Sequence, residues 1–237
     1  MKVVTAFSHK GGTGKTTSLA MIANAAASKQ ERVLLIDADV QQSFSLWKAL
    51  SDQDDLWVPN FSVRYFNFQK TKIATMEDFL LEANESGDYD LCLMNLAGVE
   101  HPFNRMAIRY AEVVLLPFKP ALVELQLLEP AIEEIKSLSQ EGEVGQYRLV
   151  FSSVPSKSKM TVEARDYMKM ARDAYPCLET EIAHSAIFQN LLAKGVLHKT
   201  IQRAREGGAS RDLIQIPHYE TALDNCVRLY DEVKGLM

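Results

Sequence analysis

The sequence predicts an α/β protein whose mostly parallel, twisted sheet carries helices on both faces. Apolar runs of strand length alternate with longer amphipathic stretches along the whole chain, a pattern typical of parallel sheets with crossover helices. No repeat, low-complexity tract or linker rich in Gly, Pro or Ser divides the sequence. With 237 residues, of which 47% are hydrophobic and 24% charged, the chain suits one large domain. We therefore expect residues 1–237 to form a single domain.

Strands are expected where apolar, often β-branched residues form short runs, because the strands of a parallel sheet are buried on both faces. These runs are residues 3–7, 32–36, 62–66, 91–94, 113–116 and 147–151. Helices are predicted between them at residues 16–29, 76–85, 104–110, 121–139 and 160–175. After residue 179 the strand signal fades. We expect short helices near 187–193 and 199–206, and a last helix at 219–233.

The composition of the chain limits the cellular locations and the binding partners that we expect for the protein. The chain has a net charge of −5, so any contact with nucleic acid needs a local basic patch. Its three cysteines are far apart and have no metal-ligand spacing, which favours structural thiols in a reducing compartment. Neither a secretory signal nor an apolar run long enough to span a bilayer is evident. A cytoplasmic protein is expected.

The segment "SHKGGTGKTTS", residues 8–18, lies between a predicted strand and a predicted helix. It departs from the strict phosphate-loop pattern because His9 stands where the first glycine belongs. A chance match to its seven specified positions has a probability on the order of 10⁻⁶, so we set aside a simple glycine-rich turn. By the general phosphate-loop mechanism, Lys15 holds the β and γ phosphates and the Thr16 hydroxyl binds Mg²⁺. The predicted nucleotide-binding residues are Lys10, Gly11, Gly12, Thr13, Gly14, Lys15, Thr16 and Thr17.

A second lysine in this loop, Lys10, has no task in that mechanism. The loop resembles that of the deviant Walker A ATPases, a family that includes ParA, MinD, the nitrogenase iron protein and VirC-type proteins, and whose signature is the extra lysine. The resemblance implies that Lys10 reaches the phosphates of a partner's ATP in a nucleotide-sandwich homodimer. It also implies ATP and Mg²⁺ as cofactors, and catalytic roles for Lys10 and Lys15.

The resemblance extends to three further segments. "RVLLIDADVQQS", residues 32–43, is similar to the family's second strand and switch segment, although Val40 and Gln42 replace its usual proline and glycine. Carboxylates at the end of this strand can order the Mg²⁺ shell and an attacking water, and the family analogy ties Asp39 to hydrolysis. Taken alone, the Asp-x-Asp pattern would more often be a loop or a helix cap. "VVLLPFKPALVELQLLE", residues 113–129, resembles the family's next strand and the turn into its helix.

"DYDLCLMNLAGV", residues 88–99, occupies the place of the Walker B strand, whose acidic position is here Asn95. An amide oxygen can accept from an Mg²⁺-bound water but lacks the charge that strengthens this hydrogen bond. Thr16, Asp39 and, through water, Asn95 are thus the predicted metal-site residues. Asn95 is either a tolerated substitution or the cause of a slowed ATPase. A further alternative is an ATP-binding switch with little turnover.

The last residues of the chain help to distinguish the MinD branch of the family from the other branches. The MinD branch ends in a basic amphipathic helix that binds membrane, whereas residues 218–237 hold four acidic and two basic residues. We expect this helix to pack Leu223, Val227 and Tyr230 against the domain, because an acidic helix is a poor ligand for anionic lipid. A MinD-like membrane-associated ATPase remains the alternative from another class.

The segment "KGVLHKTIQRAREGGASR", residues 194–211, concentrates positive charge. It is either a solvated face or a patch that binds DNA without sequence preference. Its candidate DNA-binding residues are Lys194, Lys199, Arg203, Arg205 and Arg211. "LLAKGVLHKT" within this region also resembles the C-terminal part of VirC-type and plasmid ParA-like proteins.

Together these features predict a short ParA-like or VirC-like ATPase. It would dimerise around ATP, bind DNA as the dimer, reset on slow hydrolysis, and so position or segregate a plasmid, a transferred DNA or a protein cluster. The expected partners are a second copy, non-specific DNA and an unidentified activating or adaptor protein. The expected location is the cytoplasm, on the nucleoid.

Overall fold

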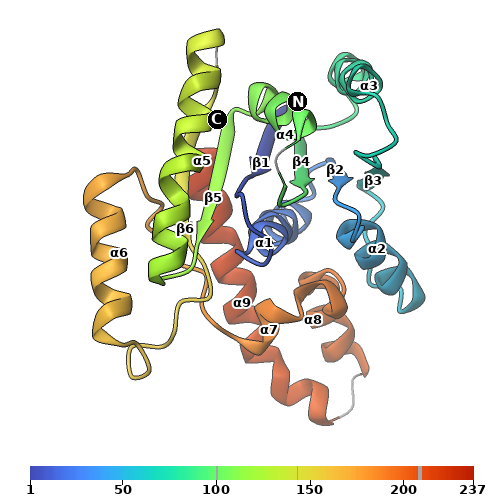
Figure 1. The fold of residues 1–237 in the computed structure, drawn as a ribbon. Helices are drawn as coiled ribbons and strands as arrows, with labels where there is room; N and C mark the ends of the chain where they lie inside the picture. The colour runs from blue at the N-terminus through green and yellow to red at the C-terminus, as the bar shows by residue number, and fades with distance from the viewer. Residues whose placement is uncertain (100, 143, 208–209) are drawn as a thin grey trace.

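A six-stranded, entirely parallel sheet forms the centre of the computed structural model, which describes residues 1–99, 101–142, 144–207 and 210–237 (Figure 1). The strand order is β3-β2-β4-β1-β5-β6. Every pair of neighbouring strands is parallel, which confirms the predicted fold class. The strands are β1 (Lys2–Ala6), β2 (Val33–Ala38), β3 (Phe61–Tyr65), β4 (Leu91–Leu96), β5 (Val113–Phe118) and β6 (Gln146–Phe151).

Helices cover both faces of the sheet, because successive strand residues point alternately into two apolar cores. Val4 and Ala6 of β1 enter the core formed with α1, α2 and the C-terminal helices, whereas Val3 enters the core formed with α3 to α6. The helices are α1 (Lys15–Ser28), α2 (Ser43–Gln53), α3 (Ile73–Ser86), α4 (Pro102–Tyr110), α5 (Leu122–Glu141), α6 (Val162–Ala174), α7 (Ala186–Gln189), α8 (Leu197–Gly207) and α9 (Ser210–Lys234). A short 3₁₀ helix, η1 (Leu191–Lys194), precedes α8.

The structure differs from the predictions at two helices, α2 and α9. The sequence analysis did not predict α2, which is largely polar and buries only Phe44, Trp47 and Ser51. The last helix was predicted to begin at residue 219, but α9 begins at Ser210. Pro217 lies inside α9, and a proline usually marks a helix boundary, so the pattern before it carried no clear helical signal.

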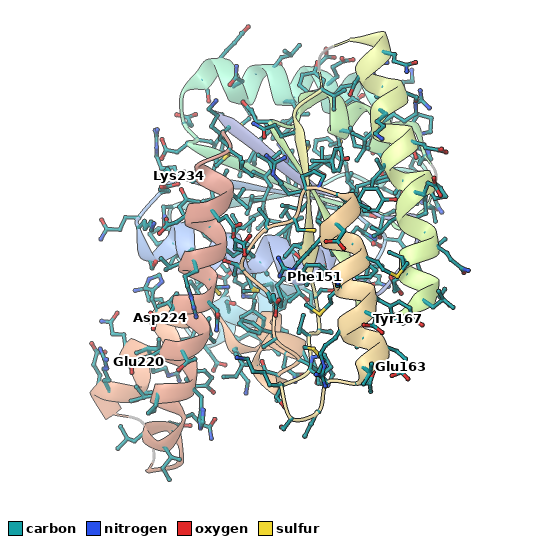
Figure 2. All side chains as sticks on the ribbon, turned by 90° about the vertical axis from the view of Figure 1, so that its left-hand side faces the viewer. Phe151, Glu163, Tyr167, Glu220, Asp224 and Lys234 are labelled. Atoms are coloured by element: carbon teal, nitrogen blue, oxygen red, sulfur yellow. The ribbon has the colours of Figure 1, made fainter. Side chains whose placement is uncertain are left out.

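The C-terminal helix α9 packs against the domain, as predicted, and it does so along α1. Tyr230 is buried and donates its hydroxyl hydrogen to Glu31, while Leu223 and Val227 are half-buried against the same core. Figure 2 shows Glu220, Asp224 and Lys234 spaced along this helix. Within the residues that the structure describes, no helix is both long enough and apolar enough to span a bilayer.

Candidate functional site

The glycine-rich loop lies between β1 and α1, at the carboxyl edge of the sheet and flanked by β4 and β5. Gly14 has a φ of 114°, and a Cβ atom on it would lie 3.0 Å from the Cβ of Ser152. Ser152 follows β6, and its hydroxyl donates a hydrogen bond of 2.5 Å to the Thr13 carbonyl oxygen. This packing requires glycine at position 14, and it fixes the loop against the end of β6.

A second close approach fixes the other side of the loop. A Cβ atom on Gly98, two residues after β4, would lie 3.0 Å from the backbone nitrogen of Gly11 and 3.0 Å from the carbonyl oxygen of Lys10. The segment after β4 therefore lies directly on the backbone of the loop. Any residue larger than glycine at position 98 would displace one of the two segments.

Lys15 points into the curve of the loop. Its ammonium donates to the Ser8 hydroxyl at 3.2 Å and to the Lys10 carbonyl oxygen at 3.1 Å, and only 7% of the residue is exposed. Burial lowers the pKa of Lys15, and the charge of Asp39 partly opposes that shift. The loop thus presents a largely desolvated ammonium beside the backbone amides at the start of α1, which suits a phosphate group.

Thr16, Asn95 and Asp37 form a chain of hydrogen bonds across β2, β4 and α1. The Thr16 hydroxyl donates to Asn95 Oδ1 at 3.0 Å, and Asn95 Nδ2 donates to Asp37 Oδ1 at 3.1 Å. Asn95 therefore uses both ends of its amide, and its carbonyl oxygen lies beside the hydroxyl that was predicted to bind Mg²⁺. The structure thus brings together Thr16 and Asn95, two of the three predicted metal-site residues.

Asp37, near the end of β2, and Asp39, just after it, have different surroundings. Asp37 is fully buried and accepts hydrogen bonds from the backbone nitrogens of Phe44 (2.9 Å) and Ser45 (3.5 Å), so it caps the start of α2. Burial raises the pKa of Asp37, while the hydrogen bond from Asn95 opposes the shift. Asp39 is half-buried, and among the described residues its carboxylate accepts a hydrogen bond from the Gln41 nitrogen alone, at 3.0 Å. Asp39 is thus the carboxylate that keeps free acceptor capacity near Lys15.

The side chain of Lys10 contacts α5. Its ammonium lies 2.8 Å from Glu124 Oε1, and the side chains are 47% and 10% exposed, respectively. The neighbouring His9 contacts Glu134 of the same helix at 3.4 Å. The sequence analysis missed Glu124 and Ser152, because no local pattern connects the loop with residues more than a hundred positions away.

The oxygen atoms around Thr16 fit Mg²⁺. This ion prefers oxygen ligands, retains several waters and is held by one or two protein groups together with substrate phosphates. Thr16, Asn95 and Asp39 supply a hydroxyl, an amide oxygen and a carboxylate at one edge of the sheet. Within the described part of the chain, no group of three or more His, Cys, Asp or Glu side chains could hold a metal by itself.

A cavity of about 50 Å³ adjoins the loop on the side of β6. Gly14 and Thr17 line it from the loop and α1, and Ser152, Ser153 and Phe188 line it from the opposite side. The exposed side chains of His184 and Gln189 also line this cavity and contact each other at 3.1 Å.

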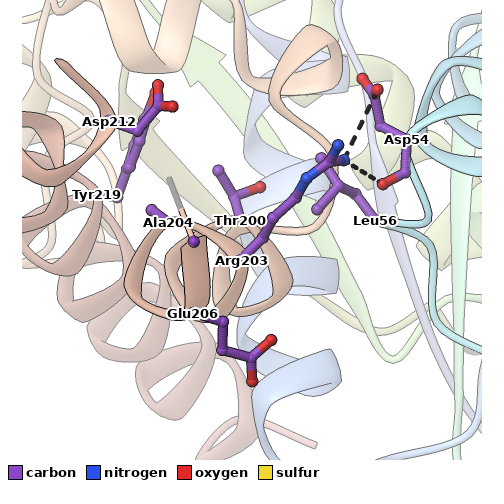
Figure 3. A pocket seen from close by; sticks show the side chains of 9 residues that line it. Asp54, Leu56, Thr200, Arg203, Ala204, Glu206, Asp212 and Tyr219 are labelled. Atoms are coloured by element: carbon purple, nitrogen blue, oxygen red, sulfur yellow. Dashed lines mark hydrogen bonds and ion pairs between the residues drawn. The ribbon is translucent and has the colours of Figure 1, made fainter. Parts of the chain in front are cut away.

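The basic segment lies on η1 and α8, and part of its charge is already paired. Arg203 donates to the Asp54 carbonyl oxygen and lies 3.7 Å from the Asp54 carboxylate (Figure 3), and Arg205 pairs with Glu220. Among the described residues, Lys194 and Lys199 have no carboxylate partner. The side chain of Arg211 lies outside the described part of the structure.

The parallel sheet, the glycine loop after β1 and the two lysines of that loop define a phosphate-loop protein of the deviant Walker A class. The chain belongs to the VirC1 protein family, whose family model matches residues 1–237.

The relatives and the solved structures agree with this assignment. The chain is 25% identical over 212 residues to protein virC1 of Rhizobium rhizogenes (89% of each chain), and 25% identical over 196 residues to protein ParA of Rhizobium radiobacter (80% of this chain, 83% of the relative). The fold is similar to that of an Aquifex aeolicus MinC:MinD cell division complex (TM-score 0.65, 20% identity, covering 97% and 96%). It is also similar to that of a Cyanothece McdA–ATP complex (TM-score 0.66, 16% identity, covering 97% and 96%). These findings confirm the predicted ParA/VirC-like family and the fold.

Proposed function

We propose that this protein is an ATPase that forms a homodimer around two ATP molecules. One observation carries the proposal: the two lysines of one phosphate loop have different surroundings. Lys15 is enclosed by the loop, whereas the side chain of Lys10 is 47% exposed and contacts Glu124 of α5. A single nucleotide on the loop needs only Lys15. Lys10 would therefore exchange its contact with Glu124 for the phosphates of a nucleotide on a second copy.

The surface around Lys10 supports this dimer. Val40, Val99, Leu122 and Val123 are each about half exposed, and they follow β2, β4 and β5 at the edge of the sheet that carries the loop. Exposed apolar residues gathered around a site indicate an interface, because burying them removes apolar surface from water. The second copy would thus cover the open side of the nucleotide site.

In the proposed site, Lys15 and the amides of residues 11–16 hold the phosphates, and Thr16 and Asn95 hold Mg²⁺, the latter through water. A Mg²⁺ held by these residues would supply positive charge that opposes the negative charge developing in phosphoryl transfer. Asp39 orients the attacking water, because it is the nearby carboxylate whose acceptor capacity is not used by the fold. Lys10 of the second copy would stabilise the same charge.

Slow turnover is part of the proposal. Both ends of the Asn95 amide are engaged, with Thr16 and with Asp37, and the amide carries no charge toward a Mg²⁺ shell. This arrangement favours a long-lived ATP state and keeps open the second candidate function, an ATP-binding switch with little turnover.

The cellular role would be to position or segregate a cargo. The relationship to protein virC1 and protein ParA supports a role with DNA, and Lys194 and Lys199 are the cations of the basic segment that carry no carboxylate partner in the described structure. We propose that the ATP dimer binds DNA without sequence preference in the cytoplasm, on the nucleoid, and that an adaptor protein stimulates hydrolysis.

Multi-angle light scattering with ATP and Mg²⁺, compared with ADP and Mg²⁺, tests the core of this proposal. A dimer with ATP and a monomer with ADP are expected, since Lys10 needs a γ-phosphate across the interface. The same mass with both nucleotides would contradict the proposal. A pelleting assay with anionic liposomes beside a DNA shift assay separates it from a MinD-like membrane function.

A further inference from the structure

A groove on the side of the molecule away from the basic segment has the features of a protein-docking site. Its volume is about 560 Å³, and it lies between α6 and the segment that follows β6. Figure 1 shows α6 as the outermost helix beside β6, and in Figure 2 the same helix, marked by Glu163 and Tyr167, faces the viewer. None of the proposed nucleotide or DNA contacts involves this groove.

The floor of the groove is apolar. Pro155, Met160 and Met168 line it, and Met168 is 7% exposed. Methionine side chains are flexible and polarisable, so they adapt to the shape of an inserted apolar side chain. The floor therefore suits a leucine, methionine or phenylalanine of a partner.

The rim of the groove is cationic. Arg172 is held in place, because it stacks on Phe151 at 4.6 Å and pairs with Glu181 at 2.8 Å. Lys157, Arg165 and Lys169 are exposed, and in the described part of the chain none of them is paired with a carboxylate. With Glu181 engaged by Arg172, Asp173 is the acidic side chain left among the lining residues. The unpaired charge at the rim is thus positive, on a protein of net charge −5.

We propose that this groove docks a segment of a partner protein in which acidic residues flank an apolar side chain. The acidic residues complement Lys157, Arg165 and Lys169, and the apolar side chain enters the floor at Met160 and Met168. The apolar floor favours a protein over a nucleic acid, since a phosphate backbone offers no apolar group to bury. A helix laid into the groove is one geometry that such partners use.

Two chain segments connect the groove to the phosphate loop. Ser152 packs on Gly14, and the same segment reaches the groove at Pro155 and Lys157. Ile182, Ala183 and His184 line the cavity beside Gly14, while the adjacent Glu181 lines the groove. The backbone hydrogen bonds from Val154 to Ile182 and from His184 to Val154 hold the two segments together. A docked segment would therefore affect nucleotide affinity, a consequence that rests on the proposed function.

Selection from a phage-displayed random peptide library on the full-length protein without nucleotide tests the docking site. The selected peptides should combine Asp or Glu with a Leu, Met or Phe, and they should shift the ¹³C-methyl NMR signals of Met160 and Met168. The double variant Lys157→Glu, Lys169→Glu should weaken their binding by about tenfold or more, a range typical of an unfavourable reversal of interface charge. The matched control Lys70→Glu, Lys72→Glu changes the net charge equally on a remote exposed surface and should leave binding unchanged.

The proposal is overturned if no acidic peptides are enriched, or if the enriched peptides leave the Met160 and Met168 signals in place. It is also overturned if duplex DNA moves these signals and the acidic peptides do not, which would make the groove a nucleic-acid site. Since all of these measurements are made without nucleotide, a failure of the docking site is distinguishable from a failure of the proposed ATPase. In a separate measurement, the bound peptide should change the Kd for ATP.

Discussion

The ammonium of Lys10 lies 2.8 Å from the carboxylate of Glu124, although the two residues are 114 positions apart in the sequence. Glu124 is at the start of α5, and its side chain is only 10% exposed. A carboxylate this buried is costly when it loses its cation. If Lys10 reaches the phosphates of a second copy, the contact with Glu124 must be exchanged for the new one, so Glu124 opposes dimer formation.

Glu124→Gln should therefore strengthen the ATP-dependent dimer. The amide keeps the size of the side chain and removes the charge that retains Lys10, and we expect the dimer dissociation constant to fall by about tenfold, equivalent to about 1.4 kcal/mol. Sedimentation velocity with ATP and Mg²⁺ measures this constant. Glu129→Gln, on an exposed position of the same helix, is the control. A weaker dimer in Glu124→Gln would mean that Glu124 orients Lys10 toward the partner.

Substitutions of the two loop lysines should have different effects on nucleotide binding and on dimerisation. Lys15→Ala should abolish nucleotide binding, because it removes the ammonium enclosed by the loop. Lys10→Ala should retain nucleotide and lose the dimer, because the side chain lies outside the cradle. Titration with a fluorescent ATP analogue, followed by light scattering of the same samples, measures both effects. Equal nucleotide affinity in the wild type and in both variants would rule out these roles.

Asn95→Asp should lower the free energy of unfolding, apart from any effect on catalysis. The new carboxylate would face Asp37 across the 3.1 Å contact where Asn95 now donates a hydrogen bond, and Asp37 is fully buried. We expect a loss of about 1–3 kcal/mol in the free energy of unfolding, the usual cost of an unsatisfied buried polar group. Urea denaturation measures this loss, which Mg²⁺ with ATP should reduce. If Asn95 restrains hydrolysis, phosphate release by the variant should exceed that of the wild type; a lower rate would favour a tolerated substitution.

The affinity for ATP should begin to fall at a lower pH than it would if the phosphate-binding lysine were exposed. Burial lowers the pKa of Lys15, so its folded-state ammonium loses its proton below the ordinary lysine value of about 10.4. Above the lowered pKa of the free protein, binding a phosphate requires Lys15 to take up a proton first, so the affinity falls as pH rises through that pKa. Calorimetric titrations between about pH 7 and about pH 10 should also show proton uptake on binding. A constant affinity over this range would disprove the assignment to Lys15.

DNA binding by the ATP dimer should depend more on Lys194 and Lys199 than on Arg203 and Arg205, because both arginines are paired with carboxylates. For phosphate contacts, log K falls against log[salt] with a slope of about −0.9 per neutralised phosphate, so each lost contact flattens it by about 1. The variant Lys194→Glu, Lys199→Glu should show the flatter slope for every DNA sequence tested. If the wild-type dimer did not bind DNA at low salt, this prediction would be wrong.

The strands and the loop could be predicted from the sequence because their signals are local. Buried parallel strands such as β5 read as uninterrupted apolar runs, and the spacing of Lys10, Gly14 and Lys15 is contained in a few residues. Helix α2 escaped prediction because its start is stabilised by Asp37 of β2 and its buried face consists of only three residues. Glu124 and Ser152 escaped because only the folded sheet brings α5 and the end of β6 to the loop.

The hydrogen-bonded chain from Thr16 through Asn95 to Asp37 ends at the first amides of α2. Both tryptophans of the protein belong to this region: Trp47 lies on α2, and Trp57 follows it with its ring centroid 5.3 Å from that of Trp47. A change in the position of α2 would alter the contact between these two indole rings. Intrinsic fluorescence in rapid-mixing experiments would therefore report, without any label, a movement of α2 that accompanies nucleotide binding at the phosphate loop.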